Sequence, residues 1–281
     1  MILTAPELAQ ALEQAEATHL SRQVAACSQL KGYEQSRVIT ICGGVAAVTD
    51  PVFGRKLNHV TALGMGAVVH TDELAQLENI YAAQGLETQI DVCPHTDGST
   101  LAVLSERGYS VNAFSNTYVR QLMPTDTYTA INGGSRSDIE IVTDRALVEA
   151  TFIGDSVAGF SVQVVNRPAV LLETLAQIAL QRSDTFLFAA TIDGKVAGTA
   201  GMSLIETASG LLAHLHIAST LPAYRGRGVQ LALLSARLTA ARNAGCTLAG
   251  VTARPANSSA RNTERAGFSL AYTKSTFIKS R

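Results

Sequence analysis

The most constraining feature of this chain is an arginine- and glycine-rich turn between an apolar, strand-like run and an amphipathic, helix-like run. The strand-like run covers residues 211–220, the helix-like run covers residues 229–244, and the turn reads Arg225-Gly226-Arg227-Gly228. The first backbone N–H groups of a helix have no acceptor within the helix, and the helix dipole is positive there. Glycines at this point let an anion approach the main chain. The pattern therefore predicts a turn that binds a phosphate or diphosphate.

Two common phosphate-binding motifs do not fit this turn. A Walker loop needs Gly-Lys-Ser/Thr, which is absent, and a dinucleotide fingerprint needs a third small residue where Leu231 stands. The turn instead resembles motif A of the GNAT superfamily of acetyl-CoA-dependent N-acyltransferases, Arg/Gln-x-x-Gly-x-Gly/Ala, with Gln230 at the last, normally small, position. The side chain of Gln230 either narrows the turn or donates an extra hydrogen bond through its amide. A solvated basic helix start is the alternative interpretation.

The residues after the helix-like run extend the resemblance. A short apolar strand at 248–252, a loop ending in Asn257 and a short helix at 258–266 precede Gly267, which is suited to a helix C-cap. Gly267 and Phe268 are expected to begin a strand pair. This order resembles motif B of GNAT enzymes, and the similarity covers about residues 138–281. It implies a mixed, mostly antiparallel sheet flanked by helices.

Two segments that begin at Gly108 and Gly267, 159 residues apart, align without a gap. Both repeat the order Gly, aromatic, Ser, aliphatic, and later Thr, aromatic, aliphatic, cation, which indicates an internal repeat. Chance similarity between two β-hairpin endings is the alternative. The repeat predicts an α/β chain of mixed α+β type with two GNAT-like domains. The expected ranges are 1–124 for a degenerate N-terminal domain, 125–137 for the linker and 138–281 for the acetyltransferase domain.

The N-terminal counterpart of the phosphate turn, Leu63 to His70, contains two glycines but no arginine. We therefore expect this half to shape the substrate site, support the structure or form a homodimer, and not to bind the cofactor.

Composition limits the classes of partner. The net charge is −1 and charged residues make up 16% of the chain, which argues against a general nucleic-acid binder. The four cysteines have no metal-ligand spacing and are typical of reduced thiols in a cytoplasmic protein. No signal peptide is recognisable, and no apolar run reaches the roughly 20 residues of a membrane span. We expect a cytoplasmic protein with no metal and no membrane partner.

The predicted chemistry needs a base, because an alkyl amine is protonated at neutral pH and must lose a proton before it attacks a thioester. His214 and His216 are the candidates, since residues two apart on a strand project from the same face. Their spacing before Arg225 resembles that of the paired histidines of arylalkylamine N-acetyltransferases. Hydrogen-bonded sheet histidines without a catalytic role are the alternative.

The resemblance also assigns contacts to acetyl-CoA. It places the pantetheine arm along residues 218–220 and the diphosphate at the turn, whose two arginines either meet phosphates or are surface charges. The two asparagines after the turn contact the pantetheine or the thiol, or act as ordinary cap residues. The predicted cofactor-binding residues are Ala218, Ser219, Thr220, Arg225, Gly226, Arg227, Gly228, Val229, Gln230, Leu231, Asn257 and Asn262.

One departure concerns the general acid. Many family members have a tyrosine that protonates the departing thiolate, and Thr263 stands at that position. Tyr272, Ser259 or water could take the role, or the thiolate leaves unassisted. The resemblance implies an acetyl-CoA-dependent N-acetyltransferase that uses direct attack by a small-molecule primary amine in a ternary complex. A protein or peptide amine is the alternative acceptor, and a non-catalytic acyl-CoA sensor or assembly module is the alternative function.

Overall fold

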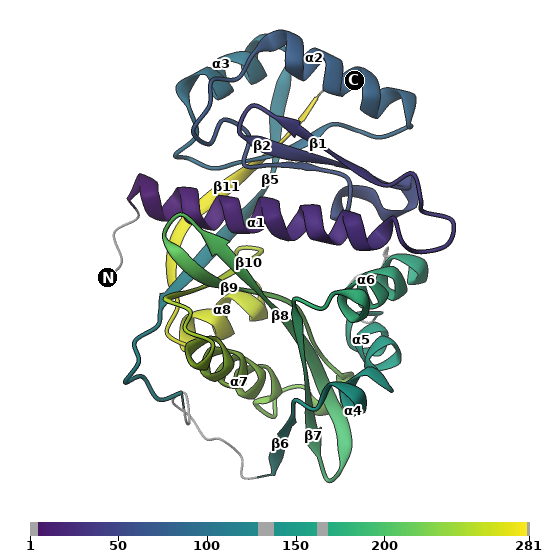
Figure 1. Cartoon of the computed structure of the whole chain (residues 1–281), viewed down its shortest axis with the longest axis vertical. Coiled ribbons are helices and arrows are strands. Elements are labelled where there is room, and N and C mark those ends of the chain that lie inside the picture. The colour runs from purple at the N-terminus through teal and green to yellow at the C-terminus, as the bar shows by residue number, and fades with distance from the viewer. Residues whose placement is uncertain (1–4, 129–137, 162–167, 280–281) are drawn as a thin grey trace.

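The computed structural model describes residues 5–128, 138–161 and 168–279. Within these ranges the strands form one mixed sheet of 11 strands, with helices on both faces (Figure 1). The strands are β1 (Arg37–Ile41), β2 (Gly44–Val48), β3 (Val60–Thr61), β4 (Gln89–Val92), β5 (Tyr109–Gln121), β6 (Ile139–Val142), β7 (Thr185–Ile192), β8 (Lys195–Thr207), β9 (Gly210–Thr220), β10 (Leu248–Ala253) and β11 (Ser269–Lys279). The helices are α1 (Pro6–Cys27), α2 (Thr71–Ala83), α3 (Gly98–Glu106), α4 (Arg145–Glu149), α5 (Phe152–Ser161), α6 (Ala169–Gln181), α7 (Val229–Asn243) and α8 (Ser258–Arg265), with 3-10 turns η1 (Pro51–Lys56) and η2 (Pro222–Tyr224).

The strand order is β1-β2-β3-β4-β11-β5-β10-β9-β8-β7-β6. Among the described residues, neighbouring strands are antiparallel except for the pairs β3–β4 and β9–β10. This is the mixed, mostly antiparallel sheet flanked by helices that the sequence predicted. Most of the predicted linker, residues 129–137, lies outside the described residues.

The internal repeat is visible in the order of elements. The series β4, α3, β5 in the N-terminal half is followed 159 residues later by β10, α8, β11. The strand pair expected to begin at Gly267 and Phe268 is wrong, because β11 is a single long strand, as is its counterpart β5. Neither strand contains Gly, Pro or Asp at which it could fold back on itself, so each stays extended and pairs along its length with neighbouring strands.

The two halves exchange their last strands. β11 pairs with β4 of the N-terminal half, β5 pairs with β10 of the C-terminal half, and β5 and β11 pair with each other in the middle of the sheet. Figure 1 shows these two strands running side by side through the centre of the molecule. The predicted domains at 1–124 and 138–281 therefore share one sheet, and each depends on a strand of the other.

Two apolar runs of the N-terminal half, each long enough for one strand, are interrupted. The run at residues 37–47 folds into a hairpin of β1 and β2, because Cys42 and Gly43 both adopt positive φ. A Cβ at Gly43 would lie 2.5 Å from the carbonyl oxygen of Met65, so the close approach requires glycine there. The run at residues 59–69 is extended only as far as Thr61, because Ala62 adopts φ 59° and begins an irregular turn.

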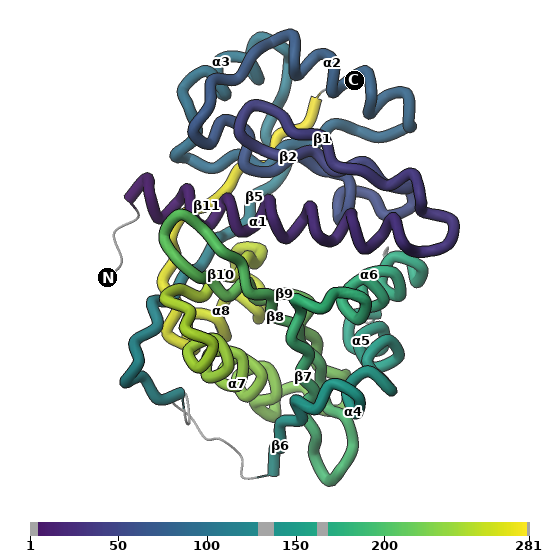
Figure 2. Tube along the Cα trace, viewed as in Figure 1, coloured from purple at the N-terminus to yellow at the C-terminus, as the bar shows by residue number. Residues whose placement is uncertain are grey.

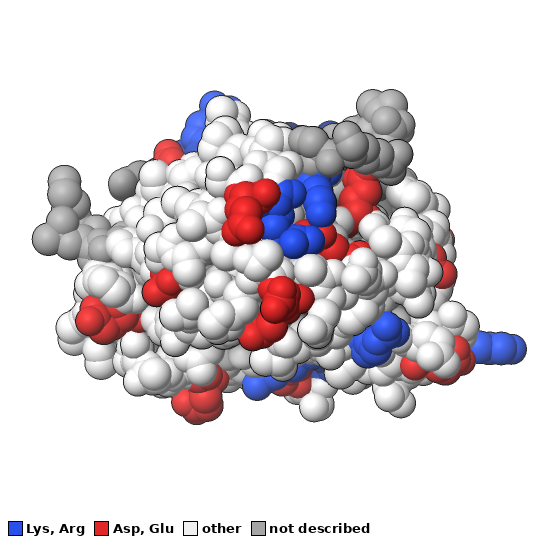
Figure 3. Space-filling model, turned by 90° about the horizontal axis from the view of Figure 1, so that it is seen from above, with Lys and Arg blue, Asp and Glu red and all other residues white. Residues whose placement is uncertain are grey.

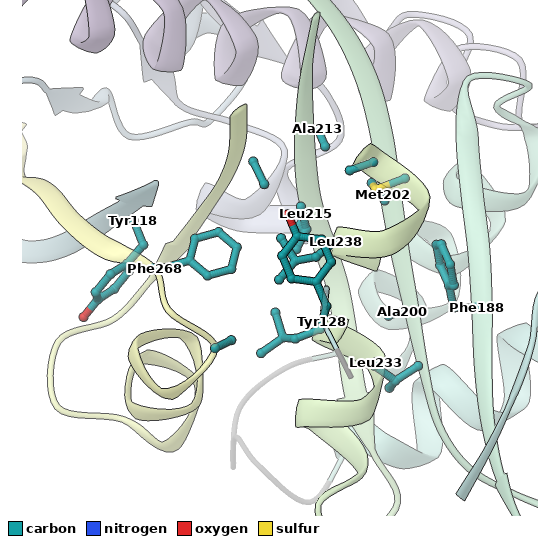
Figure 4. Packing of buried hydrophobic residues seen from close by; sticks show 14 of the residues in the cluster. Tyr118, Tyr128, Phe188, Ala200, Met202, Ala213, Leu215, Leu233, Leu238 and Phe268 are labelled. Atoms are coloured by element: carbon teal, nitrogen blue, oxygen red, sulfur yellow. The ribbon is translucent and has the colours of Figure 1, made fainter. Parts of the chain in front are cut away.

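The main core of the C-terminal half lies between α7 and the sheet (Figure 4). Leu233 and Leu238 of α7 pack against Leu215 of β9, while Phe268 and Tyr118 extend the cluster towards α8 and the exchanged strand β5. Burial of such apolar side chains provides about 1.5–3 kcal/mol each. It fixes the position of α7, and therefore of the turn at its N-terminus.

The opposite face of the sheet is covered by α1, α5 and α6. Figures 1 and 2 show α1 lying between the two halves, and it contacts β2 in one half and β8 in the other. Leu12 and Ala15 of α1 belong to a core cluster that also includes Leu212 of β9 and Tyr272 of β11. Helix α1 therefore helps to cover this face of the C-terminal half of the sheet.

The surface seen from above in Figure 3 carries small groups of Lys and Arg next to Asp and Glu, separated by wide uncharged areas. Among the described residues visible on this face, the cations do not merge into one broad basic area. Among residues 5–128, 138–161 and 168–279, no helix has the length and apolar character needed to cross a bilayer.

Candidate active site

The parallel strands β9 and β10 separate in the C-terminal half of the sheet. They pair only as far as His214 and Gly250. Beyond this point β9 continues to Thr220 against β8, while β10 continues to Ala253 against β5. The separation leaves a main-chain edge of β9 facing an opening in the sheet, and that edge includes the predicted pantetheine contacts at 218–220.

A bulge at Ile217 changes the course of β9 next to this opening. Ile217 adopts φ 45°, and the register between β8 and β9 shifts between Thr199 and Gly201. A positive φ is strained for a β-branched residue, and such strain is concentrated at functional sites. A Cβ at Gly201 would lie 2.9 Å from Cε1 of His216 and from Cγ2 of Ile217, so glycine is needed opposite the bulge.

The arginine- and glycine-rich turn lies at the end of β9, as predicted. Gly226 and Gly228 adopt φ 74° and 88°, and Gly228 is the N-cap of α7 with no side-chain hydrogen bond to the helix. No described heavy atom lies within 4 Å of the position that a Cβ at Gly226 would occupy. The N-cap residue of α7 thus has no side chain that could satisfy the first amides of the helix, and the binding of a diphosphate there stays a prediction.

Both arginines of the turn also contact the protein. Arg225 Nη2 donates to the carbonyl oxygen of Gly159 in α5 at 3.3 Å. Arg227 forms an ion pair with Asp138 at 2.9 Å, and its guanidinium lies 5.6 Å from the ring centre of Tyr224. These contacts hold the turn against α5 and the segment before β6. A direct role of either arginine at a phosphate stays a prediction.

Gln230 connects the two helices of this face. Its Nε2 donates to Ser259 Oγ at 3.2 Å, and its Oε1 accepts from Asn262 Nδ2 at 2.7 Å. Asn257 caps α8, because its Oδ1 accepts from the amide of Ala260 at 2.7 Å. The side chains of the two predicted asparagine contacts therefore have structural partners within the protein.

His214 and His216 lie on the same face of β9, as their spacing predicted, with ring centres 6.1 Å apart. His19 of α1 completes the cluster, with its ring centre 4.4 Å from that of His214 and 4.3 Å from that of His216. Sequence reasoning missed His19, because nothing in the local pattern of α1 marks it. Among the described residues, no group of His, Cys, Asp or Glu has an arrangement that could hold a metal ion.

Arg182, at the end of α6, orients this cluster. Its Nη1 donates to His19 Nδ1 at 3.1 Å, its Nη2 donates to Ser203 Oγ at 3.1 Å, and it pairs with Asp184. Ser203 Oγ in turn lies 3.0 Å from Nε2 of His216. Because arginine can only donate, His19 accepts through Nδ1 and carries its proton on Nε2. The network links His19 of α1 to His216 of β9 through Arg182 at the end of α6 and Ser203 of β8.

The three histidines are neutral at neutral pH. Burial lowers the pKa of His214 to about 4, and the negative charge of Glu16 only partly opposes this effect. Burial and the neighbouring histidine and arginine side chains lower the pKa of His19 and of His216 well below the usual value. A neutral imidazole has a free lone pair, so His214 and His216 are in the state that accepts a proton.

The candidate general acids are poorly placed. Thr263, at the tyrosine position of the family, is 1% exposed. The hydroxyl of Tyr272 already donates to Glu13 at 2.7 Å, and burial together with that carboxylate raises the pKa of Tyr272 far above its usual range. Ser259 Oγ accepts from Gln230. None of these three side chains is an effective proton donor to a thiolate.

The comparisons with known proteins agree with the geometry. Residues 159–268 match the model of the acetyltransferase (GNAT) family. A search of curated proteins found no match. Similar solved structures include a GCN5-related N-acetyltransferase from Kribbella flavida, 16% identical over 94% of this chain and 95% of that chain, with a TM-score of 0.59.

Two further structures show the same fold. One is a tandem GNAT protein from the clavulanic acid biosynthesis pathway, 12% identical over 95% of both chains, with a TM-score of 0.59. The other is a GCN5-related N-acetyltransferase from Sphaerobacter thermophilus, 16% identical over 87% of this chain and 75% of that chain, with a TM-score of 0.54. At these identities the likeness concerns the fold alone. Residues 159–268 are therefore a GNAT acetyltransferase domain, a family that implies acetyl transfer from acetyl-CoA.

Proposed function

We propose that this protein is an N-acetyltransferase in which a primary amine attacks acetyl-CoA directly in a ternary complex. The observation that supports this best is the arrangement along β9. This strand carries His214 where it separates from β10, His216 and the bulge at Ile217 just beyond, and the open turn at Gly226 after its end. A single strand thus links a diphosphate-binding turn to two neutral bases.

Acetyl-CoA supplies the activated acetyl group as a thioester. The amides at residues 226–231 would hold its diphosphate through the positive end of α7. The main-chain edge of residues 218–220 would form hydrogen bonds with the pantetheine arm, which would lie beside β9 like an additional strand. The bulge at Ile217 changes the course of the main chain beside the proposed position of the thioester carbonyl. A main-chain amide there would be the oxyanion donor, because the carbonyl oxygen gains negative charge during the attack.

His214 accepts the proton that the acceptor amine must lose. An alkyl ammonium group has a pKa near 10, so deprotonation has to accompany binding. The first ammonium proton goes to the imidazole of His214, the nitrogen–carbon bond forms, and the carbon–sulfur bond breaks with its electron pair on sulfur. The second proton of the attacking nitrogen neutralises the thiolate, directly or through solvent, and this step needs no side-chain acid. His216, whose Nε2 lies 3.0 Å from Ser203 Oγ, is the second candidate base beside His214.

The test is a thiol-release assay with acetyl-CoA and a panel of amines that includes small alkyl amines, aryl amines and a lysine peptide. His214→Gln and His216→Gln are expected to lower the transfer rate by about 10²–10⁴-fold, the usual contribution of a general base. Their affinity for CoA should be unchanged in calorimetry. His70→Gln is the matched control, because His70 is exposed and lies in the other half.

Two results would contradict the proposal. A His214→Gln/His216→Gln protein with wild-type transfer rates would remove the histidines from the mechanism. Binding of acetyl-CoA without thiol release for any amine in the panel would favour a non-catalytic sensor.

A further inference from the structure

A small pocket lies beneath α1 at the point where β9 and β10 separate. Its volume is about 10 Å³, enough for the centre of about one water molecule. Its polar lining comes from four elements that are distant in sequence. These are Glu16 of α1, Thr117 of the exchanged strand β5, and His214 and Thr252 of the two separating strands. The exchange of β5 between the halves is therefore what brings Thr117 to this place.

The pocket contains an unsatisfied hydroxyl. Thr117 is only 3% exposed, and its Oγ1 has no hydrogen-bond partner among the described residues. A buried polar atom without a partner costs about 1–3 kcal/mol. Such a group beside the proposed reaction centre indicates that a ligand supplies the missing hydrogen bond.

The pocket also contains a carboxylate. Glu16 Oε2 accepts from Lys274 Nζ at 2.8 Å, and Thr252 Oγ1 lies 3.5 Å from the same oxygen. Burial raises the pKa of Glu16, but the charge and the hydrogen bond of Lys274, together with the field of His214, outweigh this effect and hold the pKa below its usual value, so Glu16 is ionised. Lys274 is shared with a second buried carboxylate, Glu13, at 2.7 Å. One lysine therefore serves two acidic groups, and one of them faces the pocket.

We propose that this pocket binds the ammonium group of the acceptor, and that the acceptor is a small primary alkyl amine that is cationic in solution. A primary ammonium has three N–H donors. Glu16, the Thr117 hydroxyl and the neutral imidazole of His214 are three acceptors around the same small volume. His214 then takes the proton that leaves before attack. This assignment rests on the proposed acetyltransferase function and names the chemical class of its acceptor.

The same features exclude other amines. An aryl amine is neutral at pH 7 and gains nothing from the carboxylate of Glu16. A secondary amine places a second carbon on the nitrogen, and a pocket of this size has no room for it. The N-terminal half thus determines acceptor choice through Glu16 and Thr117, which is the substrate-shaping role that the sequence left open for it.

The test measures binding of ethylamine to the CoA-saturated full-length protein by NMR titration, independently of catalysis. A ligand with three heavy atoms binds no tighter than about the millimolar range. Glu16→Gln and Thr117→Val are each expected to weaken binding about tenfold or more, as the loss of a charge-assisted or a buried hydrogen bond predicts. Three probes lack features of a primary ammonium: ethanol and aniline are uncharged at pH 7, and diethylamine, when protonated, has only two N–H groups. Each should bind at least tenfold more weakly than ethylamine.

Glu13→Gln is the matched control. It also removes a carboxylate from Lys274, but Glu13 is fully buried outside the pocket. Ethylamine binding to this variant should stay within about threefold of wild type. Equal losses in Glu13→Gln and Glu16→Gln would overturn the proposal, because a general disturbance around Lys274 would then explain both. Equal binding of ethanol, or no saturable binding of ethylamine to wild type, would overturn it as well.

The pocket and the enzyme activity fail in different ways. If ethylamine binding depends on Glu16 but no amine is acetylated, the pocket assignment stands and the proposed function fails. If Glu16→Gln acetylates ethylamine with unchanged kcat/KM, the function stands and the pocket assignment fails.

Discussion

Replacement of Lys274 by methionine is expected to destabilise the fold strongly. Lys274 Nζ is completely buried on β11 and bridges to α1 through Glu13 at 2.7 Å and Glu16 at 2.8 Å. It also donates to Thr61 Oγ1 of β3 at 3.3 Å. The substitution keeps the apolar stem but leaves two carboxylates in the interior without a cation. Removing one partner of a buried ion pair costs about 3–5 kcal/mol.

The loss can be measured as the free energy of unfolding from urea titrations at pH 7, followed by circular dichroism because the chain has no tryptophan. Lys279→Met is the matched control on the same strand. Lys279 is 41% exposed and pairs with Glu78 at the surface, so its removal should cost less than about 1 kcal/mol. Equal losses for the two variants would refute the reasoning, since burial of the pair would then contribute nothing.

The pH dependence provides an independent check. Burial raises the pKa of Glu16, but the charge and hydrogen bond of Lys274, with a smaller effect of His214, bring the folded pKa below its usual value. Wild type therefore gains stability from Glu16 above the unfolded pKa of about 4.5 and loses it as the pH falls through the folded value. Without Lys274 this advantage is absent, and burial raises the pKa of both carboxyl groups. The difference between wild type and Lys274→Met should therefore shrink as the pH falls from about 6 to 4.

Three further predictions concern the site itself. Burial lowers the pKa of His214 to about 4, so the unfolded state binds the proton of this residue first as the pH falls. The contribution of His214 to the free energy of unfolding should fall by about 2.5 kcal/mol between pH 6.5 and 4, and His214→Gln should show a profile flatter by that amount in urea titrations. Gly201→Ala places a Cβ 2.9 Å from Cε1 of His216 and should lower kcat with little change in CoA affinity by calorimetry. Gly226→Glu should weaken CoA binding about 100-fold or more by blocking the turn and repelling the diphosphate, whereas Gly194→Glu, at an equally open glycine with φ 72° against 74°, should leave it unchanged.

Local features of this fold could be predicted from the sequence. The turn at 225–228 was recognised because glycines before an amphipathic run have a direct conformational meaning, and both glycines adopt positive φ. The hairpin of β7 and β8 turns at Asp193-Gly194, a pair typical of type I′ turns, and both residues adopt the positive φ of such a turn. The same-face placement of His214 and His216 follows from the period of a strand.

The contacts between distant parts of the chain could not be predicted in this way. The pairing of β5 with β10 depends on strands more than a hundred residues apart, and a strand looks the same whether its partner lies in its own half or in the other. His19 and Arg182 read as ordinary residues of helix ends and faces, yet packing of α1 and α6 brings them to within 3.1 Å. The turn proposed to bind CoA is therefore built from residues that are adjacent in sequence, whereas the pocket proposed for the acceptor is built from distant segments.

A crystal structure of the protein with bound CoA would show whether the turn at 225–228 holds the diphosphate. We expect the diphosphate oxygens to accept hydrogen bonds from the main-chain amides of residues 226–231, and the pantetheine arm to lie along the edge of β9 towards His214. Density for CoA at any other place, with this turn unchanged and without a ligand, would show that the proposed site is wrong.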